Sequence, residues 1–165
     1  MNKFVIAVYV ENKFGVLTRV TSMFTRRGFN ISALTVGETE SPEYSRITIS
    51  MEGDGYARNQ MINQLRKLYN VKKVELLEPD KSINRELMLI KVKNNPDTRQ
   101  EILSAASIFR SNIIDYSPDA LCIETTGEPS KIDAFIEIMK PFEIIEMCRT
   151  GIVALERGSG SILKK

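Results

Sequence analysis

The chain has 165 residues, of which 42% are hydrophobic and 27% charged, and its net charge is +2. This length and composition suit one globular domain or two small ones. The near-neutral charge argues against the strongly basic surface of a typical nucleic-acid binder.

The residue types needed for common catalytic and metal sites are scarce. Histidine is absent, which removes the commonest general base and metal ligand. Cys122 and Cys148 lie in apolar surroundings without a CxxC spacing and are predicted to be free thiols. Asp and Glu are scattered and form no compact pair in one motif, which leaves carboxylate chemistry open without indicating it. We expect no catalytic residue, no metal ligand and no cofactor on this chain.

The start of the chain is predicted to be part of the folded protein. Its apolar stretch is shorter than that of a signal peptide, and no apolar run approaches the roughly 20 residues that span a bilayer. We expect a cytoplasmic protein without a membrane-spanning segment.

The first half of the sequence shows alternating strand and helix patterns. Apolar residues recur at helical spacing in two segments, and apolar runs bounded by turn residues predict four strands. Arg26 and Arg27 end the first helix, where positive charge suits the helix dipole. The predicted order is strand, helix, strand, strand, helix, strand, at residues 3–10, 16–27, 30–39, 45–52, about 61–69 and 71–78.

The second half repeats this order of elements although its residues barely repeat. Its predicted elements are at residues 85–93, 96–109, 112–117, 119–127, 130–140 and 142–151. The predicted fold class is α+β, with two tandem ferredoxin-like βαββαβ units. The expected division is a first domain at 1–78, a linker at 79–84, a second domain at 85–151 and a partly flexible tail at 152–165.

The first strand, "KFVIAVYV", carries apolar residues on both faces. Such a strand lies centrally in a sheet with something covering each side. Because the two helices of the unit cover only one side, we expect the other sheet face or an edge to meet a partner, most simply a second copy of the chain.

The loop between this strand and the first helix is a candidate binding site. Asn12 offers a donor and an acceptor, and Gly15 precedes a helix start whose free N–H groups suit a carboxylate. Asn30 begins the next strand and could contribute from another chain. Apolar walls would come from Val16, Leu17 and Ile31, so the set suits a small zwitterion with an aliphatic side chain. The alternative is that Asn12, Gly15 and Asn30 only form turns.

A resemblance bears on this choice. The segment "ENKFGVLTRVTSMFTRRGFNISALTV" resembles the ACT domain of the acetohydroxyacid synthase regulatory small subunit family. Further matches are "SRITI", "RELMLIKV", "IFRSNIIDYSPDALCIETTG", "KIDAF" and "RTGIVALERG". The resemblance thus extends over essentially the whole chain, and makes the first unit an ACT domain.

The resemblance implies a non-catalytic subunit that activates a separate catalytic subunit and confers feedback inhibition by valine in branched-chain amino-acid synthesis. It implies thiamine diphosphate, Mg²⁺ and FAD on the catalytic subunit, and a homodimer that pairs its ACT domains and binds valine at the junction. Carried over by motif, the effector contacts are Asn12, Gly15 and Asn30. Val16, Leu17 and Ile31 are added from their adjacency.

Other functions are possible for this order of elements, since a shared fold does not carry function. One is an acylphosphatase-like small hydrolase, for which "GVLTR" would supply an Arg in the first loop and helix start. Another is an amino-acid-sensing ACT regulator of a different enzyme. RNA-recognition motifs share the plan but need exposed aromatics on the third strand, and "SRITISME" has none.

Overall fold

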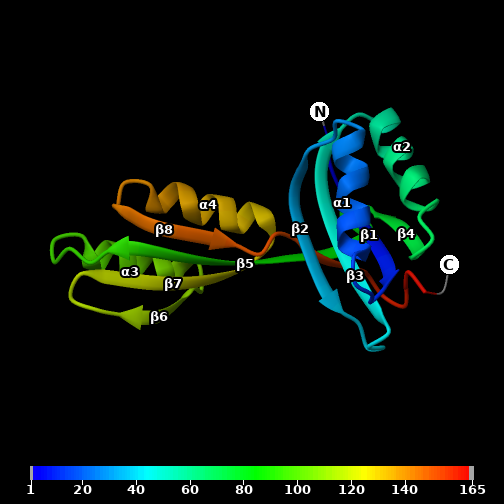
Figure 1. The fold of residues 1–165 in the computed structure, drawn as a ribbon. Helices are drawn as coiled ribbons and strands as arrows, with labels where there is room; N and C mark the ends of the chain where they lie inside the picture. Colours follow the sequence, from blue (N-terminus) through cyan, green and yellow to red (C-terminus); the bar gives the residue numbers. More distant parts are fainter. Residues whose placement is uncertain (1, 164–165) are drawn as a thin grey trace. The chain divides into compact units, whose positions relative to one another are not determined.

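The helices and strands follow the order βαββαβ twice. The structure is a computed structural model that describes residues 2–163, and Figure 1 shows its ribbon. The first set is β1 (Asn2–Glu11), α1 (Val16–Arg26), β2 (Ile31–Glu38), β3 (Tyr44–Gly53), α2 (Gly55–Leu65) and β4 (Val71–Leu77). The second set is β5 (Ser82–Lys93), α3 (Arg99–Ile108), β6 (Asn112–Tyr116), β7 (Ala120–Gly127), α4 (Pro129–Met139) and β8 (Ile144–Arg149). A short strand, β9 (Val153–Glu156), follows.

Both sheets have the strand order of the ferredoxin-like plan. The first is antiparallel with the order β2-β3-β1-β4, and the second repeats it as β6-β7-β5-β8. The predicted fold class, two tandem βαββαβ units, is therefore confirmed. The chain divides into a unit of residues 1–83 with 151–165 and a unit of residues 84–150.

One helix begins earlier than predicted. The apolar stripe placed the second helix at about 61–69, whereas α2 runs from Gly55 to Leu65. The Asp54 carboxylate accepts a hydrogen bond from the Ala57 N–H at 2.7 Å and so caps the helix. None of residues 55–60 is buried, and a search for apolar periodicity misses such turns.

The core of the first unit lies between its sheet and its two helices. Alternate residues of the two central strands β1 and β3 face α1 and α2, which cover the same side of the sheet (Figure 1). The buried residues of this core include Ile6, Val8, Val10, Val20, Phe24, Ile47, Ile49, Met61 and Leu65. The remaining β1 residues therefore point to the opposite face.

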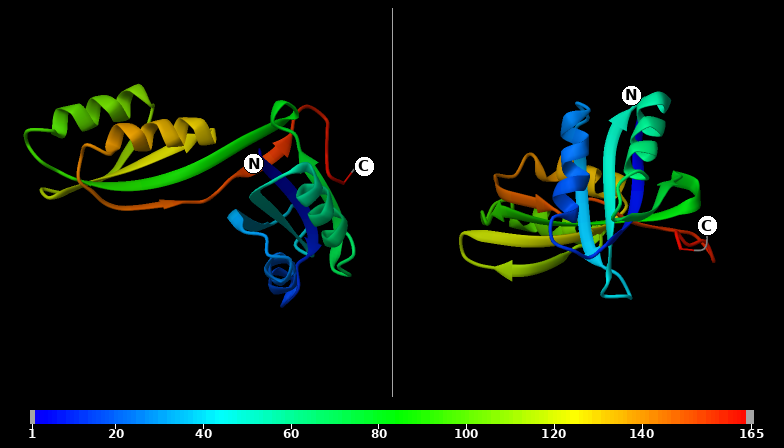
Figure 2. Two further views of the ribbon diagram at one scale, coloured as in Figure 1. Left: turned by 90° about the horizontal axis from the view of Figure 1, so that it is seen from above. Right: turned by 45° about the vertical axis from the view of Figure 1, so that its right-hand side comes forward.

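That opposite face is covered by the chain's own C-terminal segment. Figure 2 shows this segment in red on the side of the first sheet away from α1 and α2. The buried cluster here consists of Val5, Ala7, Tyr9, Leu77, Ile152, Ala154 and Ile162. This face was one of the two places where we expected a partner, and the sheet edge is the other. Of the predicted tail, Ile152, Ala154 and Ile162 are buried against the face.

A hydrogen bond and a close backbone approach hold the C-terminal segment in place. The Arg46 guanidinium on β3 donates a hydrogen bond from Nη2 to the Ala154 carbonyl at 2.7 Å, and burial lowers the pKa of Arg46. Gly151 has φ +78°, and a Cβ added there would lie 2.9 Å from the Ala33 Cβ. A glycine is therefore required where the segment passes β2.

Residues 79–84, expected to be a polar linker, are ordered backbone. A 3₁₀ turn at Pro79–Lys81 leads directly into β5. Ser82 is buried and its hydroxyl donates to the Glu78 carbonyl at 2.8 Å. The Arg157 N–H donates to the Lys81 carbonyl at 2.8 Å, so this connection is also held by the C-terminal segment.

Ile152→Ala should destabilise the first unit because it opens a cavity in the buried cluster between the first sheet and the C-terminal segment. Removal of three carbons from a side chain that is 5% exposed costs about 2–4 kcal/mol. Urea unfolding followed by circular dichroism measures the change. The control Val153→Ala changes an exposed side chain on the neighbouring position and should cost less than about 0.5 kcal/mol. Equal stability of the two variants would show that this segment does not contribute to the core.

Candidate functional site

The loop from β1 to α1 is tied to the turn between β2 and β3. The Asn12 N–H donates to the Glu43 carbonyl at 2.7 Å. The Asn12 Nδ2 donates to the Glu38 carboxylate at 3.1 Å and to the Pro42 carbonyl at 3.0 Å. These bonds use both amide protons, and the amide oxygen remains available to accept a bond from a ligand ammonium group.

Gly15 starts α1 in a conformation that suits glycine. Its φ is +78°, and no side chain caps the helix. A Cβ added at Gly15 would meet no atom within 4 Å among the described residues. The backbone at the helix start is therefore open to a ligand, and its first N–H groups carry partial positive charge that favours a carboxylate.

The apolar residues beside this loop differ in orientation. Val16 is buried in the helix-side core, and its backbone N–H donates to the Lys13 carbonyl at 3.3 Å, so its side chain does not form a wall for a ligand. Leu17 is 40% exposed, so its side chain is accessible beside the loop. Phe14 is fully exposed directly before Gly15. Sequence reasoning did not single out Phe14, although an aromatic residue in a polar loop was a visible signal.

Asn30 and Ile31 lie at the other end of the sheet from Asn12. On β2, Ile31 pairs with Met51 and Glu38 pairs with Ser45. Seven residue steps along a strand separate the two ends, which is about 23 Å. Within one chain, Asn12, Gly15 and Leu17 thus share one end of the unit, and Asn30 and Ile31 share the other. One small amino acid cannot touch both sets in a single chain.

The strand β2 that connects these two ends is an edge strand. It pairs with β3 and with no other strand of residues 2–163. Its outer N–H and C=O groups can therefore pair with another chain. Val36 on this strand is 44% exposed, and Ile31 and Leu34 are partly buried. The sheet's other edge strand is β4, which pairs with β1. The β2 edge is the one that connects the Asn12 end of the sheet to the Asn30 end.

A charged network fixes the end of β1 next to Asn12. The Glu11 carboxylate is paired with Lys72 and with Lys13, and accepts a bond from Asn70 Nδ2 at 2.8 Å. The Asn70 Oδ1 in turn accepts from Arg19 Nη1 at 3.0 Å. These contacts, with Lys72 contributing most, lower the pKa of Glu11 to about 2.

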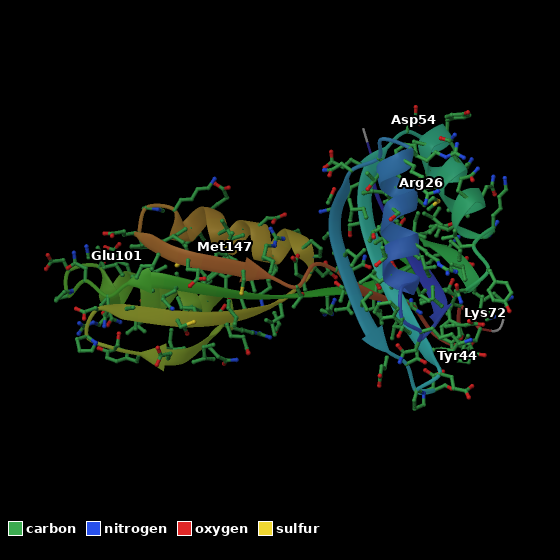
Figure 3. All side chains as sticks on the ribbon, viewed as in Figure 1. Arg26, Tyr44, Asp54, Lys72, Glu101 and Met147 are labelled. Carbon is green, nitrogen blue, oxygen red and sulfur yellow. The ribbon has the colours of Figure 1, made fainter. Side chains whose placement is uncertain are left out.

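The network involves residues that are far apart in the sequence. Figure 3 labels Lys72 and Tyr44 at the same end of the first unit. The Glu11 N–H donates to the Asn70 carbonyl at 2.9 Å, and so joins the end of β1 to the turn before β4. Sequence reasoning did not identify Glu11, Asn70 or Glu38 as parts of this site, because no local pattern shows which distant side chains meet.

The structure offers no support for acylphosphatase activity or for RNA binding by the first sheet. In an acylphosphatase-like site Arg19 would have to be free for a phosphate, but its side chain is bonded to Asn70. For RNA, the sheet face of the first unit would have to expose aromatic rings. Tyr9 and Tyr44 are stacked on this face with ring centroids 4.9 Å apart, and Tyr9 is buried beneath the C-terminal segment.

Residues 2–163 contain no group of three or more His, Cys, Asp or Glu side chains that could hold a metal ion. None of the helices in the described part of the chain is long and apolar enough to cross a membrane.

Comparison with known families defines the class of protein. Residues 6–73 match the family described as the AHAS small subunit-like ACT domain. Residues 85–158 match the family described as the small subunit of acetolactate synthase. The first unit is therefore an ACT domain, and the chain is of the regulatory ACT-domain class.

The similar proteins extend over nearly the whole chain. A probable acetolactate synthase small subunit from Methanothermobacter thermautotrophicus is 49% identical over 156 residues, which are 94% of this chain and 93% of that protein. The acetolactate synthase small subunit of Mycolicibacterium smegmatis is 43% identical over 95% of this chain and 92% of its own length. A crystal structure of the acetolactate synthase small subunit from Thermotoga maritima superposes with a TM-score of 0.89 at 41% identity, over 97% of this chain and all of that chain. The chain belongs to the acetolactate synthase small subunit family.

Glu11→Gln should lower stability near neutral pH but not in strong acid. A glutamate whose pKa falls from about 4.3 in the unfolded chain to about 2 in the fold contributes stability above pH 4 that disappears as the pH falls through 2. Thermal unfolding of both chains between pH 7 and pH 2 should show a gap in melting temperature that closes with acidification. The control Glu52→Gln removes an exposed carboxylate from the same sheet. A gap at pH 7 no larger than that of Glu52→Gln would contradict this role of the network.

Proposed function

We propose that this chain is the regulatory subunit that activates the catalytic subunit of acetolactate synthase and makes it sensitive to valine. Membership of the small subunit family supports a non-catalytic role beside a catalytic partner. In this proposal thiamine diphosphate, Mg²⁺ and FAD reside on the catalytic subunit, which condenses pyruvate with a second 2-ketoacid in the cytoplasm. The ACT domain supplies the site for the amino acid.

The proposed position of the effector site rests on one observation: Asn12 and Asn30 lie at opposite ends of the edge strand β2. A two-fold axis near the middle of β2 would pair this strand with its copy in antiparallel orientation. The Ile31 end of one copy would then lie beside the Glu38 end of the other. Because Glu38 is bonded to Asn12 within each chain, Asn30 of the second copy would approach Asn12 of the first.

The groups gathered in this way match the charges of a free amino acid. The helix start at Gly15 would bind the carboxylate. The Asn12 amide oxygen and the Glu38 carboxylate would receive the ammonium group. Leu17 and Ile31 of the other copy would contact an aliphatic side chain. Each homodimer would contain two such sites, and neither could form in a single chain.

A mixture of two variants tests whether the site is shared between chains. Asn12→Ala and Asn30→Ala should each weaken valine binding by roughly 1–3 kcal/mol, through lost hydrogen bonds to charged groups. When the two variants are mixed and their subunits exchange, about a quarter of the sites should regain both asparagines. Calorimetry of the mixture should detect this tight fraction. Binding that stays uniformly weak after exchange would show that the two asparagines do not meet in a site shared between two chains.

Gly15→Asp should abolish valine inhibition and leave activation of the catalytic subunit largely intact. A carboxylate opposite the ligand's carboxylate costs about 3 kcal/mol, on the order of a hundredfold in affinity. The matched control is Gly15→Ala. It adds a Cβ in open space and carries the same backbone strain at φ +78°, about 1–2 kcal/mol, without the charge.

Valine calorimetry on each chain and an acetolactate assay of the mixed enzyme measure the two effects. Normal valine binding by a folded Gly15→Asp chain would place the effector elsewhere and leave Gly15 as a turn residue. An unmixed chain that formed acetolactate from pyruvate would overturn the regulatory role. Valine binding without any effect on the catalytic subunit would favour an ACT regulator of another enzyme.

A further inference from the structure

A basic groove lies between α1 and α2 of the first unit, outside the proposed effector site. Its volume is about 430 Å³. The residues that line it are Arg19, Met23, Arg26, Arg27, Gln64, Lys67 and Leu68. Figure 3 labels Arg26 on α1. Four of the seven lining residues are cationic and none is acidic.

The absence of acidic residues extends along both helices. Neither residues 12–37 nor residues 55–74 contain an Asp or a Glu. Among the described residues, Arg26, Arg27 and Lys67 have no ion-pair partner within 4.0 Å, and all three are exposed. The nearby acids have other contacts, since Asp54 caps α2 and Glu11 is paired with Lys72 and Lys13.

Stabilisation of helix ends explains only part of this concentration of positive charge. Arg26 lies in the last turn of α1, where a cation suits the helix dipole. Lys67 lies two residues beyond the end of α2, where a cation likewise suits the helix dipole. That effect does not account for the absence of an acidic residue from both helices. Four like charges around one groove repel each other, and an anionic partner would relieve this repulsion.

The floor of the groove is apolar. Met23 and Leu68 are partly buried and pack against the helix-side core. An apolar floor surrounded by arginine side chains suits a partner that brings both an apolar side chain and carboxylates. Arginine is well suited to this because its planar guanidinium pairs with a carboxylate through two hydrogen bonds.

We propose that the α1–α2 groove docks an acidic, partly apolar segment of the catalytic subunit. This inference rests on the proposed function, in which a catalytic subunit is the partner. Two arguments support the proposal: the positive charge of the groove, and the use of the other surfaces of the first unit for other contacts. Within the described residues of the first unit, the C-terminal segment covers the sheet face opposite the helices, and the proposed function assigns the β2 edge to a second copy. The α1–α2 face has neither role.

Subunit affinity should therefore depend on salt and on the charge at the groove. The complete chain is titrated against the cognate catalytic subunit, and the half-saturating concentration for activation is measured at low and at physiological ionic strength. Arg27→Glu should raise this concentration tenfold or more at low salt and reduce its salt dependence. Arg26→Gln combined with Arg27→Gln removes the charge without reversing it at the helix end and should give a smaller rise in the same direction.

Arg157→Glu is the matched control, because it makes the same charge change at an exposed position after β9. It should leave the half-saturating concentration within about twofold of the unmodified chain. Valine calorimetry on every variant checks the fold and the effector site, and it should be unchanged.

An Arg27→Glu chain that binds valine and activates at the unmodified concentration would overturn the docking proposal and leave the proposed function standing. The same conclusion would follow if pyrophosphate bound the groove with one-to-one stoichiometry, lost that binding in Arg27→Glu, and subunit affinity did not change. In that case the groove would serve a small anion. If the unmodified chain failed to bind the catalytic subunit at all, the proposed function itself would fail.

Discussion

The arrangement of the first unit depends on one constraint: β1 is apolar on both faces and must be buried on both. The helices cover Ile6 and Val8, and no further helix of the repeat is available for Val5 and Ala7. The chain meets this requirement with a segment that follows the entire second unit. The hydrophobic effect therefore joins the two ends of the sequence, and the second βαββαβ unit is inserted between β4 and the segment that completes the first core.

Closure of this sheet face limits where function can lie. A face covered by Ile152 and Ala154 cannot bind a nucleic acid or a second sheet. The surfaces of the first unit on which the proposals rest are the β2 edge, the loop at Gly15 and the helical layer. Backbone groups at the edge are suited to a second copy of the chain, and the free N–H groups of a helix start are suited to a carboxylate. The cations on α1 and α2 are suited to an acidic surface.

The two ends of β2 give the proposed site its dependence on assembly. Asn12 and Asn30 are separated by the length of the strand, so a ligand that needs both can bind only where two chains meet. An effector bound in this way favours the association of the two chains, because ligand binding and association are thermodynamically linked. In the proposed function, the ACT domain thus influences its partner through the geometry of its dimer.

The sequence by itself determined the order of elements, the central position of β1 and the family, because apolar periodicity and turn residues are local signals and the motifs are read directly. It also located the loop of Asn12 and Gly15, since a strand end followed by glycine and a helix start is a local pattern. Tertiary structure alone decided that Val16 faces the core and that Asn30 lies far from Asn12. It also decided that Ile152, Ala154 and Ile162 are buried on the first sheet, on the face opposite the helices. It alone brought Glu11 to Asn70 and Arg26 to Lys67. These placements depend on pairing between distant segments, and such pairing is set by which faces remain to be buried after the local elements have formed.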